Sequence, residues 1–107
     1  MIALIIDQYR KHGWTLRRVL LSDAIREKVP DLASTFAHVE VREAAIDAAW
    51  FSRSSRPGST AWELRHLSAA PYALVETIHD GTTFADAEKA LGRTEERLRE
   101  KLIRRSN

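Results

Sequence analysis

The segment from Ile46 to Leu67 constrains the fold more than any other part of the chain, because it predicts one long β-hairpin. Its arms are joined by Arg56-Pro57-Gly58-Ser59, which has proline and glycine at the two centre positions of a type II turn. In the first arm, one face carries Ile46, Ala48 and Trp50, and the other carries Asp47, Ala49, Phe51 and Arg53. In the second arm, one face carries Trp62 and Leu64, and the other carries Glu63, Arg65 and Leu67.

The two tryptophans of the hairpin suggest its register. If Trp50 and Trp62 stand opposite each other, Asp47 stands opposite Arg65, and such a pair contributes about 0.2–1 kcal/mol. We expect the tryptophans to fill the core and the charged face to be solvated. The alternative is a recognition surface with Phe51 as its apolar centre, unless a helix covers that residue. The candidate surface comprises Phe51, Arg53, Arg56, Glu63 and Arg65.

The segments before the hairpin predict alternating helices and strands. The apolar spacing Ile2, Ile5, Ile6 and Tyr9 predicts an N-terminal helix that Gly13 ends near His12. A strand over 14–21 and a short helix should follow; Ser22 caps this helix, which ends near Lys28 and is broken at Pro30. We then expect a further turn or two anchored by Leu32 and Phe36, and a strand over 38–42. In the strand over 14–21, alternation places Val19 and Leu21 on one face and Leu20 on the other, with Trp14 and Leu16.

The segment from Pro71 to Ile78 is ambiguous. Its alternating residues predict a fifth strand, with proline at a tolerated first position. A short helix beginning at Pro71 is the alternative. Asp80-Gly81 then predicts a turn.

The phrases IDAAWFSR, WELRHLS and PYAL, between Ile46 and Leu74, resemble a family of short uncharacterised bacterial proteins. The resemblance covers little more than a quarter of the chain and implies no activity, cofactor or substrate. It implies that the chain is a complete small protein.

The C-terminal segment, 83–105, predicts a pair of helices. Thr83 would cap the first, Gly92 would end it, and Thr94 would cap the second. ALGRTEERLREKL is similar to helix-turn-helix segments of bacterial DNA-binding domains, but Glu88 stands where that motif wants a small residue and Arg93 where it wants an apolar one. The candidate nucleic-acid contacts are Arg93, Arg97, Arg99, Lys101 and Arg104.

Composition bounds the function classes. The 107 residues suit one domain, and 17 Lys and Arg against 15 Asp and Glu give a net charge of only +2, a weak argument for nucleic acid. The absence of cysteine excludes disulfides and thiolate chemistry. The opening MIALIIDQYRKHG lacks the form of a signal peptide, and no apolar run approaches the roughly 20 residues of a membrane span. We therefore expect a cytoplasmic protein.

Catalytic patterns are scarce. The four histidines, His12, His38, His66 and His79, are dispersed and show no zinc-binding spacing. The serines of the hairpin lack a nucleophile-elbow pattern, and the four glycines stand alone. We predict no catalytic residue, cofactor or metal ion.

The sequence thus predicts a single α+β domain, with an antiparallel sheet of four to five strands around a central hairpin, helices packed against it and a helical C-terminus. The favoured function is a non-enzymatic interaction or regulatory module that forms a homo-oligomer or binds a protein partner. A nucleic-acid-binding protein is the alternative. An enzyme that holds a small anion through Arg53, Arg56 and Arg65 ranks third.

Overall fold

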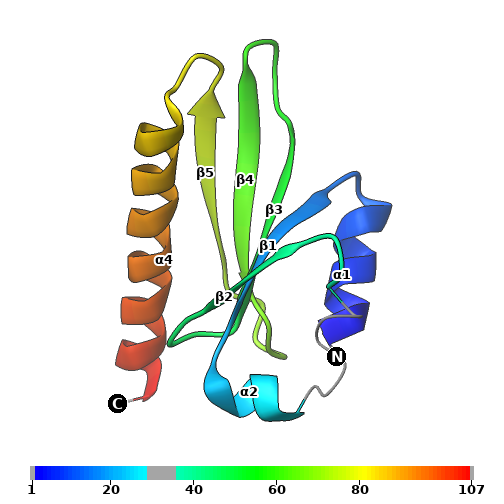
Figure 1. Ribbon diagram of the computed structural model, residues 1–107, viewed down its shortest axis with the longest axis vertical. Helices are drawn as coiled ribbons and strands as arrows, with labels where there is room; N and C mark the ends of the chain where they lie inside the picture. The colour runs from blue at the N-terminus through cyan, green and yellow to red at the C-terminus, as the bar shows by residue number, and fades with distance from the viewer. Residues whose placement is uncertain (1, 29–35, 107) are drawn as a thin grey trace.

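The structure, a computed structural model, describes residues 2–28 and 36–106 and shows a five-stranded sheet between helices (Figure 1). Its elements are α1 (Ile2–Lys11), β1 (Thr15–Leu21), α2 (Asp23–Lys28), β2 (Glu40–Glu43), β3 (Ala48–Ser54), β4 (Ser59–His66), β5 (Ala73–His79) and α4 (Phe84–Ser106). The strand order is β2-β1-β3-β4-β5, with β1 and β2 parallel and every other neighbouring pair antiparallel. The predicted α+β fold is confirmed.

The sheet buries a separate apolar cluster on each of its two faces, and Figure 1 shows α1 and α4 on opposite sides of it. On the α1 face, Phe51 packs with Ile5 and Ile6 of α1. On the α4 face, Trp50 packs with Leu91 and Leu98 of α4. The sheet is therefore the middle layer of the fold.

The N-terminal helix is confirmed. The amide of Gly13 donates to the carbonyl of Arg10 at 3.1 Å, and Gly13 has a φ of +85°, which glycine tolerates without strain. The return of the chain brings the ring of Tyr9 parallel to that of Phe51, with centroids 4.1 Å apart. A helix thus covers Phe51.

β1 contains an irregularity that alternation along the strand did not predict. Leu16 pairs with Phe51 and Arg18 with Trp50, so Arg17 is an extra residue opposite β3. Leu16 consequently lies on the α1 face with Val19, whereas we had expected it on the face of Leu20. That part of the prediction is wrong, because the bulge reverses the alternation.

The β3–β4 hairpin has the expected turn but a different register. Gly58 has a φ of +83°, and the amide of Ser59 donates to the carbonyl of Arg56 at 3.0 Å, as in a type II turn. Trp50 and Trp62 share a face with their ring centroids 6.2 Å apart, but Trp50 pairs with Leu64 and Trp62 with Ser52. The two tryptophans are diagonal neighbours, so the register with Trp50 directly opposite Trp62 is wrong.

The corrected register also changes the partner of Asp47. Ala49 is opposite Arg65, so the expected Asp47–Arg65 pair does not form across the strands. Instead, the carboxylate of Asp47 accepts hydrogen bonds from the amide of Ser22 at 2.7 Å and from its hydroxyl at 3.1 Å. Asp47 therefore anchors the residue that precedes α2.

The other elements follow the sequence with one exception. Residues 73–79 form a strand, so the helix alternative is wrong, while the expected strand over 38–42 is found at 40–43. Phe36 is buried against the α1-face cluster. Pro30 and Leu32 lie outside the described residues.

The exception is α4, which is one helix of 23 residues and not a pair. Thr83 caps it as expected, since its hydroxyl accepts from the amide of Asp86 at 3.1 Å. Gly92 continues the helix at a cost of about 1 kcal/mol relative to alanine. Leu91 and Leu98 on either side of it are buried in the α4-face cluster, and that burial outweighs the glycine. The helix-turn-helix interpretation is therefore wrong.

Candidate functional site

The five residues of the predicted hairpin surface do not form one exposed patch. Phe51 has no solvent exposure and belongs to the core, so it cannot be the apolar centre of a recognition surface. Glu63 accepts a hydrogen bond from the hydroxyl of Tyr9, and burial together with this contact raises the pKa of Tyr9. Arg65 donates to backbone carbonyls of the turn that follows β4, among them that of Ala70 at 3.1 Å. The contacts of these three residues are within the protein and stabilise its fold.

The remaining two candidate residues lie apart from each other. The guanidinium of Arg53 lies 4.4 Å from the centroid of the Trp14 ring and donates to the carbonyl of His12 at 3.1 Å. Arg56 is exposed in the turn at the end of the hairpin. The candidate surface is thus divided between the core, a contact with α1, two packed turns and the tip of the hairpin.

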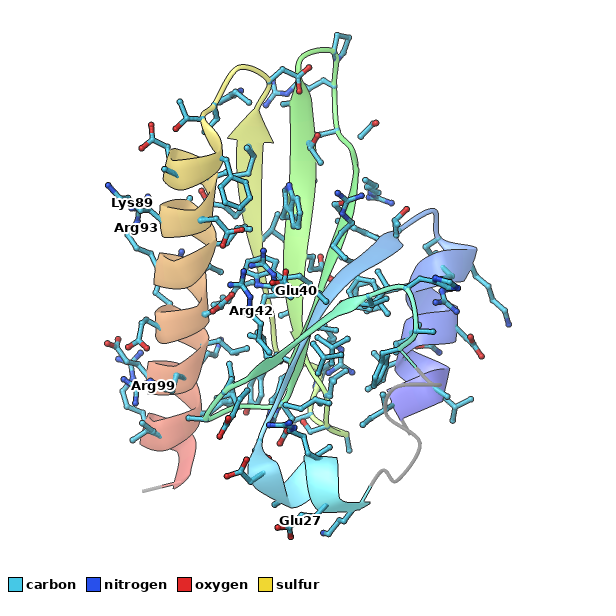
Figure 2. The ribbon with its side chains drawn as sticks, in the orientation of Figure 1. Glu27, Glu40, Arg42, Lys89, Arg93 and Arg99 are labelled. Atoms are coloured by element: carbon cyan, nitrogen blue, oxygen red, sulfur yellow. The ribbon has the colours of Figure 1, made fainter. Side chains whose placement is uncertain are left out.

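The candidate nucleic-acid contacts all lie on α4, which presents them along one rod and not on a separate recognition helix. Figure 2 shows Lys89, Arg93 and Arg99 on the side of α4 that is turned away from the sheet. Arg99 forms an ion pair with Glu96 at 2.8 Å, which lowers the pKa of that carboxyl. The ammonium of Lys101 lies 5.4 Å from the centroid of the Tyr72 ring. Arg97 and Arg104 are exposed.

An ion-pair network joins α4 to the β1–β2 side of the sheet, and sequence reasoning missed it. The side chain of Arg18 is only 9% exposed and binds Glu40 at 2.9 Å and Glu88 of α4 at 2.6 Å. Arg42 binds the same two carboxylates, at 2.7 Å and 3.5 Å. Figure 2 shows Glu40 and Arg42 in the region between β2 and α4.

Burial opposes the charge of Arg18, but its bonds to Glu88 and Glu40 outweigh that cost and raise its pKa. Arg42 and then Arg18 lower the pKa of Glu40. Within the described residues, the Nη1 atom of Arg18 is buried without a hydrogen-bond partner. The signal in the sequence was Glu88, which stands where the helix-turn-helix motif wants a small residue. In the structure its carboxylate binds Arg18 and Arg42 of the sheet.

Ser68 and His66 approach as a nucleophile and base would, with Oγ and Nδ1 2.7 Å apart. The contact is local, because Ser68 also donates its amide to the carbonyl of His66 at 3.0 Å within the turn after β4. Neither residue lines the hollows described below. The carboxylate of Asp47, just before β3, accepts a hydrogen bond from the amide of Ser22. The pair is explained by the turn.

β5 forms the most exposed apolar strand of the described fold. It has one neighbour, β4, so the backbone along its other edge is not paired within the sheet. Ala73, Val75, Thr77 and His79 are exposed on the face that α1 shares, and Val75 is 56% exposed. We call these four residues the β5 surface.

The opposite face of β5 is covered by α4. The hydroxyl of Thr94 lies 3.3 Å from the carboxylate of Glu76, the one Asp, Glu, Lys or Arg in the strand. Leu74 and Tyr72 pack against the α4-face cluster. Among the described residues, these contacts of β5 are on its α4 face, and Ala73, Val75, Thr77 and His79 on the other face are exposed.

A hollow of about 460 Å³ lies on the α1 face and is lined by apolar residues that include Ile6, Leu16 and Phe36. Its lining continues to residues 36–39, next to the range 29–35 that lies outside the described residues, and we build no site on it. A second hollow, of about 510 Å³, lies on the α4 face.

Across residues 2–28 and 36–106, no three His, Asp or Glu side chains are grouped as metal ligands would be. In the same part of the chain, no helix has the length and apolar character needed to cross a bilayer. Comparisons with protein-family models, curated proteins and solved structures found no match to the chain.

Proposed function

We propose that this chain is a non-enzymatic interaction module that acts in the cytoplasm and associates with a second copy of itself through β5. One observation carries the proposal. β5 is a seven-residue edge strand whose single formal charge, on Glu76, lies at a Thr94 contact on the α4 face, so that the exposed side chains of the strand carry no fixed charge.

The edge is long enough to support a specific contact. Seven residues at about 3.3 Å each extend roughly 23 Å. Natural proteins protect such edges with charge, proline, bulges or a covering element. β5 contains no proline, lysine or arginine, and its register with β4 is regular from Ser59–His79 to Arg65–Ala73. Its backbone is thus suited to pairing with another strand.

A second copy of the chain fits this edge well. Two identical strands can pair antiparallel about a two-fold axis, so that each satisfies the unpaired backbone of the other, and two-fold dimers are the commonest closed oligomers. The small side chains of Ala73, Val75 and Thr77 allow close approach without like-charge repulsion. The resulting dimer would contain one continuous sheet of two five-stranded halves.

Two exposed valines provide a matched test. Val75 is in β5 and Val41 in β2, at opposite edges of the sheet, and they are 56% and 38% exposed. Sedimentation at micromolar concentration should show a dimer for the wild type and for Val41→Lys, but a monomer for Val75→Lys. A wild type that sediments at 12.2 kDa would remove the dimer in favour of a different protein partner, and a dimeric Val75→Lys would place the interface elsewhere.

Nucleic-acid binding through α4 is the second candidate, favoured by the four-residue spacing of Lys89, Arg93, Arg97 and Lys101 along one side of the helix. Glu96 and Glu100 interrupt this surface, and for that reason the proposal ranks second. Fluorescence anisotropy with a duplex and a single strand at about 50 and 200 mM salt tests it. Submicromolar binding that weakens with salt and is lost on charge reversal at Arg97 and Arg99 would reverse the ranking.

A further inference from the structure

The hollow of about 510 Å³ on the α4 face is a groove that spans the sheet from β1 to the turn after β5. Its β1 side is formed by Thr15 and Arg17, its middle by residues of β3 and β4 that include Trp62, and its far side by residues 80–82. The amide of Asp80 donates to the carbonyl of Gly58 at 2.8 Å, which ties that far side to the hairpin turn. The volume is in the range of small-molecule sites.

The bulge in β1 places a second arginine on this face. In a regular strand, Arg17 and Arg18 would point to opposite faces. Because Arg17 is the extra residue between the Leu16–Phe51 and Arg18–Trp50 pairs, its guanidinium instead lies over the ring of Trp62, 5.6 Å from the centroid. Bulges recur beside functional sites, where they redirect a side chain.

The two adjacent arginines differ in their partners. Arg18 is enclosed by Glu40 and Glu88. Arg17 is exposed and forms no ion pair with a carboxylate anywhere in residues 2–28 and 36–106. Its contact with Trp62 restricts the side chain without neutralising its charge. Binding of an anion to Arg17 therefore costs little further side-chain entropy.

Hydroxyl-bearing residues line the same groove as this cation. Thr15 pairs with Ser52 across β1 and β3, and Ser54 pairs with Thr60 across β3 and β4, so four hydroxyl-bearing residues lie on the Trp62 side of the sheet. Asp80 is the exposed carboxylate of the groove. The other arginine that lines the groove, Arg53, donates to the carbonyl of His12 and lies over the ring of Trp14. A site with one cation not otherwise engaged, several hydroxyls, one carboxylate and an aromatic ring matches a polyol that carries a single oxyanion.

We propose that this groove binds a small phosphorylated sugar, with the phosphate at Arg17 and the sugar hydroxyls at Ser54, Thr60 and Asp80. The sugar phosphate of a nucleotide has the same chemistry as a free sugar phosphate, and the experiment below separates the two. The groove shares His79 with the β5 surface but not Ala73, Val75 or Thr77, and none of the residues assigned to the ligand belongs to that surface.

The indole N–H signals of the tryptophans provide a local readout by NMR. Titration with ribose 5-phosphate should shift the Trp62 signal saturably and leave the signal of buried Trp50 in place. Ribose and inorganic phosphate, as separate half-ligands, should each bind more weakly. If AMP binds more tightly than ribose 5-phosphate, the ligand is a nucleotide. If AMP binds equally or more weakly, the ligand is a free sugar phosphate. Both results support the site.

Matched variants assign the contact. Arg17→Gln should weaken ribose 5-phosphate at least about tenfold, because it removes a charge-assisted hydrogen bond, while Arg99→Gln on the outer side of α4 should leave the affinity unchanged. Thermal unfolding should confirm that both variants fold, since both side chains are on the surface. The proposal is overturned if no saturable Trp62 shift occurs, if Arg17→Gln binds as the wild type does, or if phosphate alone binds as tightly as the sugar phosphate.

Discussion

The two edge strands of the sheet, β2 and β5, differ in length and in the charge of their exposed side chains. β2 is four residues long, and three of the four carry charge: Glu40, Arg42 and Glu43. β5 is seven residues long, and its exposed side chains carry no fixed charge. A short charged edge resists pairing with another chain, whereas a long apolar one permits it. Protection of the sheet against pairing with another strand is therefore confined to the β2 edge.

The two edges also differ in how they are held to α4. β5 is covered by the helix through apolar contacts such as Leu74. β2, at the other end of the sheet, is joined to α4 through Glu88, which binds Arg18 and Arg42. The same helix is thus held by hydrophobic packing over one edge and by ion pairs toward the other, and these contacts respond to different perturbations.

The largest effect is expected from the centre of the sheet, on which both edges depend. Trp50 is fully buried, and its Nε1 donates to the carboxylate of Glu95 at 2.7 Å. Trp50→Ala should therefore lower the free energy of unfolding by about 3–5 kcal/mol, enough to unfold a small domain. Trp62 is only half-buried, so Trp62→Ala should cost less. Denaturant titration measures both, and equal costs would show that the exposure of Trp62 does not govern its contribution.

The next largest effect is expected from removing the ion pairs that Arg18 forms with Glu40 and Glu88, on the β2 side of the sheet. Arg18→Met keeps most of the side-chain volume but leaves Glu40 and Glu88 without their buried cation. Removing one partner of a buried ion pair costs about 3–5 kcal/mol, and the partial exposure of both carboxylates argues for about 3 kcal/mol here. Arg99→Met, which breaks an exposed pair on α4, should leave the unfolding midpoint unchanged. Similar losses in both variants would mean that burial of Arg18 adds nothing.

Much of the fold was predictable because local chemistry and periodicity agreed. The turn at Pro57-Gly58 was correct, and with it the two strands that flank it. The register was wrong, because two tryptophans on the same face of a hairpin can be diagonal neighbours as well as directly opposite each other. A turn with Gly58 at its third position centres the hairpin one residue further on and sets Trp50 against Leu64. The position of the turn predicts the register of the hairpin better than the pairing of the two tryptophans does.

The candidate sites were less predictable, because they depend on contacts between distant segments. A strand containing Arg17-Arg18 gives no sign of a bulge, since the extra residue is defined only by the facing strand. The ion pair between Arg18 and Glu88 joins residues 70 positions apart. Gly92 resembled a helix end, and the apolar contacts that carry α4 through it come from the sheet.

A pH measurement sharpens the contrast between the edges. Arg42 and Arg18 lower the pKa of Glu40, so its ionised form stabilises the fold. That stabilisation is complete above the unfolded-state pKa of about 4.3 and is lost as the pH falls through the lower folded-state value. Glu40→Gln should therefore be less stable than the wild type by about 0.5–1 kcal/mol at neutral pH, since Glu40 is half exposed.

The difference between Glu40→Gln and the wild type should shrink as the pH falls below the unfolded-state pKa and the carboxylate of the wild type takes up a proton. Glu43→Gln is the matched change on the same strand, where the nearest cation, Arg26, is 3.6 Å away. It should show a smaller difference at neutral pH. A Glu40→Gln deficit that persists undiminished in acid would mean that the carboxylate acts through its shape and not its charge.

The smallest effect on folding belongs to the β5 surface, where side chains meet solvent. Thr77 is exposed between Val75 and His79. In the Val75→Lys background, which should be monomeric, Thr77→Val should change the free energy of unfolding by less than about 0.5 kcal/mol, because it alters no packed contact. In the otherwise wild-type chain the same change should strengthen dimerisation, because it adds apolar area at the proposed interface. Denaturant titration and sedimentation separate the two effects. Unchanged dimerisation would place Thr77 outside the interface, and a large change in the monomer would show that this face of β5 is packed and not free to pair.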